Sequence, residues 1–217
     1  MNFAQRIFGI FFTPKKTCLT LASRPAWLDA FTLLLAALLI FTYCIVPYTG
    51  MLDTISNSTR TIIFLRAVLL THLYFLGFLI TCLILLILGR VISRGGNYVQ
   101  VFSVFVHANL IDKTLGNAVR LGFLHVNKSV FRATTSIAQF FPDLDTQSLS
   151  YAAAVQVDLF QIWFFGVLGL GLSAIFKMDL KKALCLSYGF WLLKCILNIA
   201  LIHLGMGIYR QSIFPII

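Results

Sequence analysis

The stretch that decides the fold is VDLFQIWFFGVLGLGLSAIF, which runs from Val157 to Phe176. One acidic residue, Asp158, precedes about 18 residues without a charge, a length sufficient for a helix to cross the hydrocarbon core of a bilayer. A basic cluster of the kind found at the cytoplasmic end of membrane spans follows directly, and it consists of Lys177, Lys181 and Lys182. The stretch therefore predicts a transmembrane helix over 159–176 and also predicts its orientation.

The composition extends this interpretation to the whole chain of 217 residues. Hydrophobic residues make up 59% and charged residues 11%, with a mean hydropathy of +0.92, whereas charged residues reach roughly 25% in soluble domains. The net charge is +10, but the basic residues flank apolar stretches and form no stripe that would suit a nucleic acid. Anionic lipid headgroups are a better partner for basic residues so placed. We expect a single-domain membrane protein that contacts membrane lipids and binds no nucleic acid.

Hydropathy predicts four further crossings, so we expect an all-α membrane protein with a bundle of five transmembrane helices. The expected spans cover about 28–46, 62–88, 98–124, 159–176 and 183–204. The second is longer than a bilayer requires and is expected to tilt. The third becomes polar after Leu110, so it either crosses fully to about Leu124 or stops near Leu110 as a re-entrant segment. The charge distribution favours the full crossing.

Two segments outside the spans have apolar residues at helical spacing. Residues 1–12 place Phe3, Ile7, Ile10 and Phe11 along one side, which predicts an amphipathic helix at the membrane interface. Residues 130–141 predict a second amphipathic helix, lying on the membrane and ended by Pro142.

The distribution of basic residues predicts the orientation of the bundle, because cytoplasmic segments carry an excess of lysine and arginine. Such residues are concentrated in the N-terminal segment, in the turn after span two and in the turn after span four. We therefore expect a cytoplasmic N-terminus, and five crossings then place the C-terminus on the external side.

Ionisable residues within the spans are the candidates for a functional site, because a charge at membrane depth is costly without a partner. At 1.5 Å per residue, Asp112 lies roughly 20 Å from the start of span three and Lys194 about 17 Å from the start of span five. The matching depths predict a buried Asp112–Lys194 pair, with Asn109 and Asn198 beside it. Lys113 is the alternative partner of Asp112. Such a pair is either a proton, ion or headgroup site or a lock between two helices.

Small residues in span four predict close helix packing, as they do in other membrane helices. They are Gly166, Gly169 and Gly171.

Motifs that would indicate an enzyme are missing from the sequence. It contains no H-E-x-x-H helix, nucleophile elbow, P-loop or dinucleotide-binding G-x-G-x-x-G motif. The histidines are widely spaced and form no metal-ligand pattern. We therefore expect a protein that is not an enzyme and has no cofactor and no bound metal.

Several short motifs are similar to those of a known family. Asp158-Leu159-Phe160-x-Ile162-Trp163 begins span four, and Thr13-Pro14 and Arg24-Pro25-Ala26-Trp27 precede span one. With the glycine run of span four, these resemble the bacterial branch of the Yip family, the Ypt/Rab-interacting-protein-like multipass membrane proteins. Asp158 and Trp163 are the residues of the family motif.

The resemblance implies a non-catalytic protein of the bacterial plasma (inner) membrane. Such a protein acts through an integral membrane protein partner, through self-association or by organising the membrane. The polar residues of spans three and five leave one alternative, a small transporter or lipid-handling protein.

Overall fold

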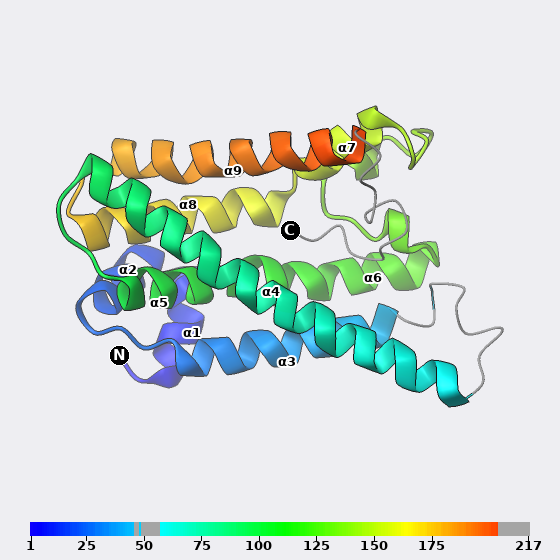
Figure 1. Ribbon diagram of the computed structural model, residues 1–217, viewed down its shortest axis with the longest axis horizontal. Helices are drawn as coiled ribbons and strands as arrows, with labels where there is room; N and C mark the ends of the chain where they lie inside the picture. The colour runs from blue at the N-terminus through cyan, green and yellow to red at the C-terminus, as the bar shows by residue number, and fades with distance from the viewer. Residues whose placement is uncertain (46–47, 49–56, 204–217) are drawn as a thin grey trace.

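The computed structural model is all-helical over the residues that it describes, which are 1–45, 48 and 57–203, without the side chains of 57–72, 74 and 131. Val46, Leu204 and the C-terminus, which bear on the expected spans and topology, lie outside these residues. In chain order the elements are α1 (Phe3–Phe12), α2 (Pro14–Ser23), α3 (Leu28–Ile45), α4 (Asn57–Ile92), α5 (Tyr98–Asn109), η2 (Leu110–Gly116), α6 (Asn117–Asn127), η3 (Val130–Arg132), η4 (Ile137–Phe140), α7 (Leu149–Gln156), α8 (Leu159–Phe176) and α9 (Leu180–His203) (Figure 1).

Four of the described helices contain a segment long and apolar enough to cross a membrane, and this confirms the prediction of an all-α protein with membrane-type helices. The segments are Leu28–Ile45, Phe75–Ile92, Leu159–Phe176 and Leu180–His203. α8 lies at the centre, because 56% of its span is buried against 11% of the span in α9. Figure 1 shows α9 beside α8 and α3 on the other side of α5 and α6, with the long α4 crossing the bundle obliquely.

The third predicted span is a helical rod that continues without a break from Tyr98 to Asn127. It consists of α5, the π-helix η2 and α6, and it packs against both α3 and α8. A π-helix has wider turns than an α-helix and often occurs at functional sites. The chain therefore remains helical beyond Leu110, where a re-entrant segment would have turned back.

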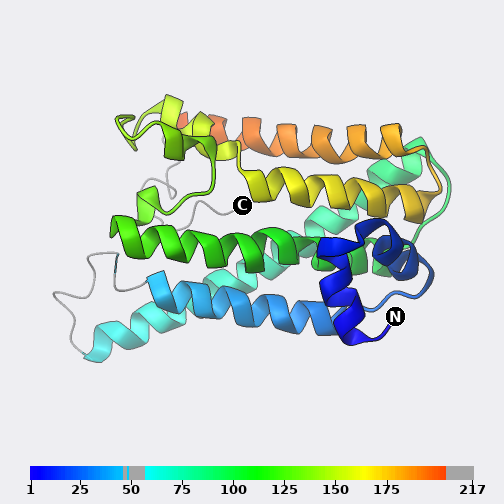
Figure 2. The ribbon, with the colours of Figure 1, turned by 180° about the vertical axis from the view of Figure 1, so that it is seen from behind.

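The N-terminal residues form a hairpin of two helices, α1 and α2. Asn2 caps α1, because its Oδ1 accepts from Gln5 N at 2.9 Å while Gln5 Oε1 accepts from Asn2 N at 3.0 Å. Pro14 begins α2, where its missing N–H leaves no helical hydrogen bond unmade. Figure 2 shows α1 lying across the direction of α3 and of the other long helices.

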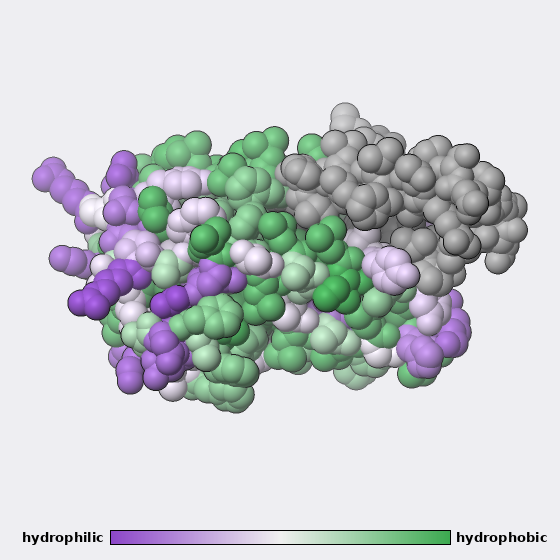
Figure 3. Space-filling model, turned by 90° about the horizontal axis from the view of Figure 1, so that it is seen from below, coloured by the Kyte–Doolittle hydropathy of each residue, from purple (hydrophilic) through white to green (hydrophobic). Residues whose placement is uncertain are grey.

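Charge is distributed unequally between the two ends of the bundle. The hairpin lies at the end where α4 and α8 finish and α5 and α9 begin, which we call the basic end (Figures 1 and 2). Hydrophilic side chains gather here, whereas the adjoining flank is mainly hydrophobic (Figure 3). The acidic residues here are Asp29 and Asp179, and the basic residues are Arg6, Lys15, Lys16, Arg24, Arg90, Arg94, Lys177, Lys181 and Lys182.

The expectation of one amphipathic helix over 130–141 is wrong. This segment contains two single-turn 3-10 helices, η3 and η4. Thr134 Oγ1 donates to Ser136 Oγ at 2.8 Å and accepts from Ser136 N at 3.1 Å. Hydroxyl groups that bond the nearby backbone compete with helix formation. Ile137 N also donates to Val157 O at 2.9 Å, which holds the segment against the start of α8.

The predicted glycines of α8 lie against neighbouring helices, and they are Gly166, Gly169 and Gly171. A Cβ added at Gly171 would overlap the side chain of Val104 on α5, and one at Gly169 would lie 2.6 Å from a methyl group of Leu184 on α9. One at Gly166 would lie 3.0 Å from the Tyr188 hydroxyl. The absence of side chains at these positions allows α8 to pack closely on both sides.

Candidate polar site within the helix bundle

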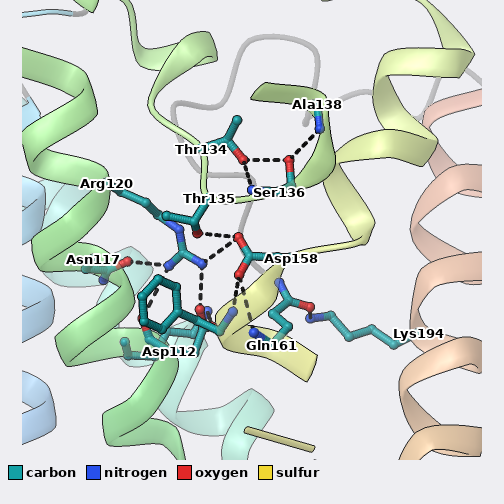
Figure 4. A network of polar contacts seen from close by, with 12 residues as sticks. Asp112, Asn117, Arg120, Thr134, Thr135, Ser136, Ala138, Asp158, Gln161 and Lys194 are labelled. Atoms are coloured by element: carbon teal, nitrogen blue, oxygen red, sulfur yellow. Dashed lines mark hydrogen bonds and ion pairs between the residues drawn. The ribbon is translucent and has the colours of Figure 1, made fainter. Parts of the chain in front are cut away.

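A buried arginine joins two carboxylates inside the bundle (Figure 4). Arg120 on α6 donates from Nη2 to Asp112 Oδ1 at 2.6 Å and to Asp158 Oδ2 at 3.0 Å. Its Nη1 donates to Asn117 Oδ1 at 2.8 Å. The two aspartate side chains are each 4% exposed and the Arg120 side chain is 13% exposed. The planar fork of a guanidinium suits this arrangement, because its N–H groups can bind several acceptors at once.

The π-helix explains how Asp112 and Arg120 come to lie on the same side of one rod. They are eight residues apart, which exceeds the roughly 7 residues of two α-helical turns. The wider turns of η2 take up the difference. The Arg120 side chain can therefore reach back along the rod to the carboxylate of Asp112.

Asp158 connects this arginine to the start of α8. Its Oδ1 accepts from Phe160 N at 2.8 Å and from Gln161 N at 3.3 Å, so it is the N-cap of the helix. A carboxylate in this position satisfies N–H groups that lack a helical partner, and it interacts favourably with the positive end of the helix. Its Oδ2 accepts from Thr135 Oγ1 at 2.5 Å as well as from Arg120. We call Asp112, Asn117, Arg120, Thr135 and Asp158 the Arg120 cluster.

The predicted ion pair between Asp112 and Lys194 is wrong, because Asp112 has other partners. Its Oδ1 binds Arg120 and its Oδ2 lies 2.9 Å from Lys113 Nζ. Lys113, predicted as the alternative to Lys194, is therefore one of the two partners of Asp112. Lys194 Nζ donates to Gln161 Oε1 at 3.4 Å. Figure 4 shows Gln161 extending from the start of α8 toward Lys194, so an amide on the intervening helix takes the place of the expected carboxylate.

The two asparagines predicted to flank the pair bind elsewhere. Asn109 Nδ2 donates to Phe105 O at 2.9 Å, within the same rod. Asn198 Nδ2 donates to Gln156 Oε1 at 3.3 Å, which connects α9 to the end of α7. Of the two residues on which the family resemblance was based, Asp158 belongs to the Arg120 cluster. Trp163 packs edge-on against Phe11 of α1, with the ring centroids 6.2 Å apart.

A second buried polar group lies nearer the basic end. Asp29, at the start of α3, forms an ion pair with Arg6 of α1, and its Oδ1 lies 4.0 Å from His107 Nε2. His107 is fully buried on α5, and its Nδ1 donates to Ser103 O at 2.8 Å. Among the described residues, neither His107 Nε2 nor Arg6 Nε has a hydrogen-bond partner. The group connects α1, α3 and α5.

The chemistry of the Arg120 cluster favours a structural role. Its charged groups bind one another across α6, the rod segment η2 and the start of α8, and Thr135 adds the segment before η4. Buried charges satisfied in this way contribute to the choice of one packing arrangement, whereas loss of one partner is strongly destabilising. No three potential metal ligands come together within the described ranges 1–45 and 57–203.

Sequence reasoning missed three members of the Arg120 cluster, namely Arg120, Thr135 and Asn117. Arg120 lies within the predicted third span, but only Lys194 and Lys113 were predicted as partners of Asp112. An available signal was Asp158, an acid directly before an uncharged span and therefore a good N-cap. A cation near the end of the preceding span is a natural partner for such a residue.

Comparison with protein-family models, with curated proteins and with solved structures found no match to this chain.

Proposed function

We propose that this chain is a non-catalytic, five-span protein of the bacterial plasma membrane that acts as a partner-binding or membrane-organising subunit. The five crossings are α3, α4, the rod from Tyr98 to Asn127, α8 and α9. Packing of the rod between α3 and α8 supports its inclusion, although its polar residues lower its hydropathy. The resemblance to the bacterial Yip proteins supports the same number of spans and the same kind of role.

The observation that carries this proposal is that the buried charges of Asp112, Asp158 and Arg120 are used in bonds to one another. A transport site needs a charged group that exchanges partners as an ion or substrate moves. A helix lock needs partners that stay together. With side chains 4% and 13% exposed, these three residues fit the second requirement. Protein or lipid contacts at the outer faces of the bundle then remain as the means of action.

The proposed orientation places the basic end in the cytoplasm, because nine basic residues and two acidic residues gather there. A reporter inserted at Gly95 should therefore be active only on the cytoplasmic side. A reporter inserted at Asp145, or fused after Ile217, should be active only on the external side. Accessibility of inserted cysteines at the first two positions to a membrane-impermeant reagent checks this. External labelling at Gly95 would reverse the orientation, and cytoplasmic labelling at Asp145 would remove the rod as a crossing.

Affinity purification tests the function itself. After cross-linking in membranes and extraction in mild detergent, the full chain should recover a defined membrane protein or a second copy of itself. An unrelated multipass protein expressed at the same level should not. Lys194→Met should leave that recovery unchanged. If the wild type recovers no partner and its proteoliposomes carry a solute flux that Lys194→Met abolishes, the subunit proposal is wrong.

One observation favours the alternative, a small transporter or lipid-handling protein. The Lys194 ammonium has three N–H donors, and its hydrogen bond is made to an uncharged amide at 3.4 Å. Among the described residues no carboxylate lies within ion-pair distance of it. Lys182→Met, at the exposed start of α9, is the control for Lys194→Met in the flux measurement, because it removes the same charge outside the proposed membrane core.

A further inference from the structure

The outward face of the N-terminal hairpin carries two adjoining hollows. The larger, of about 600 Å³, is lined by residues of α2 and by Thr13, and the smaller, of about 330 Å³, is lined mainly by α1. They share Thr13 and Lys16 as lining residues and therefore adjoin along the hairpin. We call the two hollows together the α1–α2 groove.

The other face of the hairpin is firmly packed against the bundle. Cys18 and Leu21 are fully buried, and Cys18 Sγ lies 3.7 Å from Val167 O of α8. Arg6 binds Asp29 at the start of α3. At Gly9 an added Cβ would overlap the Thr17 hydroxyl, so the two helices approach closely. The bundle therefore holds α1 and α2 in place, so the α1–α2 groove is present before a ligand binds.

The groove combines exposed aromatic and aliphatic side chains with lysines. Phe8 is 64% exposed, Phe12 81% and Leu19 53%. Lys16 lines both hollows, and Lys15 lines the larger one together with Leu19. The chain has no acidic residue before Asp29, and the Asp29 carboxylate is bound to Arg6. An apolar surface with an excess of positive charge matches a ligand that has a hydrocarbon part and an anionic part.

We propose that the α1–α2 groove binds one anionic phospholipid of the cytoplasmic leaflet. The phosphate accepts hydrogen bonds from Lys15 and Lys16, and an acyl chain packs against Phe8, Phe12 and Leu19. This inference rests on the proposed function for its leaflet, and it adds the ligand class and the residues. Interfacial lipid-binding helices combine a basic face with an aromatic and aliphatic face, and here α1 supplies the aromatic residues while α2 supplies the lysines and Leu19.

The position of the hairpin favours a lipid over an acidic segment of a partner protein. α1 lies across the direction of the long helices (Figure 2) and is tied through Arg6 to the first turn of α3. It therefore lies at the level where a proposed membrane span begins, and this is the level of lipid headgroups. Trp27, just before α3, is 37% exposed, and tryptophan is enriched at that level.

The test uses the full chain in mild detergent, titrated with phosphatidylglycerol or with phosphatidylcholine and observed by native mass spectrometry. The wild type should bind one phosphatidylglycerol about thirtyfold more tightly than phosphatidylcholine, as expected for two basic residues near one anionic headgroup. The variant Lys15→Gln/Lys16→Gln should lose this preference. The matched control Lys181→Gln/Lys182→Gln removes the same charge from exposed lysines at the same end and should keep it. Phe12→Ser should weaken the binding of both lipids equally.

Each alternative has a distinct result. An equal loss of preference in the two lysine variants would mean that only the general potential of the basic end attracts the lipid. Displacement of bound phosphatidylglycerol by an equal concentration of glycerol 3-phosphate would identify a soluble phosphate site. A photo-cross-linker at Leu19 that captures protein rather than lipid in membranes would identify a protein-docking surface. Any of the three would overturn the proposal. None depends on partner recovery, so failure here is separable from failure of the proposed function.

Discussion

Replacing Arg120 by methionine should lower the free energy of unfolding of the detergent-solubilised protein by about 3–5 kcal/mol. Loss of one partner from a buried ionic group typically has this cost, because the remaining charges stay buried without compensation. Here two carboxylates lose a partner together. Asp112 keeps Lys113, whereas Asp158 keeps the Thr135 hydroxyl and the N–H groups of α8. The start of α8 and the segment before η4 should loosen first.

The reactivity of Cys18 can be used to measure this loss of stability, because Cys18 is buried on α2. Burial raises the pKa of the Cys18 thiol to about 12, so the folded protein holds it in the unreactive protonated form at neutral pH. A thiol-reactive fluorophore should label Cys18 only on unfolding, and mass spectrometry of the labelled peptide distinguishes it from the other cysteines. Arg94→Met, at an exposed position of the basic end, is the control and should change stability by no more than about 0.5 kcal/mol.

A double variant tests whether Arg120 and Asp158 interact. Asp158→Asn keeps an oxygen that can cap α8 but removes the charge. Combined with Arg120→Met, it should cost less than the sum of the two single changes, because the pair is removed together. Additive losses would show that Arg120 and Asp158 do not interact. The combination of Asp112→Asn with Lys194→Met should be closer to additive, since these residues have different hydrogen-bond partners.

Introducing valine at Gly171 should destabilise the bundle by about 3 kcal/mol, the upper part of the usual range for overpacking a core. Its Cβ would occupy the space of the Val104 side chain on α5. Relief requires a shift of α8 away from the rod, and this shift would also disturb the contact of α8 with α2. Thermal unfolding in detergent measures the effect.

Other glycines of the chain supply the control for this change. An added Cβ at Gly189 on α9 or at Gly77 on α4 meets nothing within 4 Å, so valine there should have little effect. Val104→Ala should offset part of the loss caused by Gly171→Ala, because it empties the space that the new Cβ enters. Equal losses at Gly171 and Gly189 would contradict close packing of α8 on α5.

The sequence predicted the long helices well because membrane spans depend on one averaged quantity, the hydropathy of about 20 consecutive residues. The prediction for 159–176 coincides with α8, and α3 and α9 begin at or within three residues of the predicted spans. α4 extends beyond both ends of 62–88. Hydropathy contains no information on where a helix ends once it has left the apolar core.

The sequence predicted the level at which the candidate site lies in the bundle, but not which residues bind one another there. Counting residues placed Asp112 and Lys194 at one level, and Lys194 does bind Gln161 close to the Arg120 cluster. Partner choice depends on how each helix is rotated about its axis. For the rod this rotation depends on η2, and no simple periodicity in the sequence indicates a π-helix. Arg120 was missed for the same reason, because it lies on the side of Asp112 only through the wider turns of η2.

The π-helix has a consequence for how this chain tolerates change in length. α5 and α6 are two halves of one rod whose relative phase is set by the seven residues of η2. A deletion of one residue there would place Arg120 seven residues after Asp112, which is close to two ordinary α-helical turns. Arg120 would then remain on the side of Asp112, and the wider turns of η2 would no longer be needed. The rod can therefore lose one residue within η2 and keep Arg120 in reach of Asp112, because the wider turns hold the one residue that two α-helical turns do not.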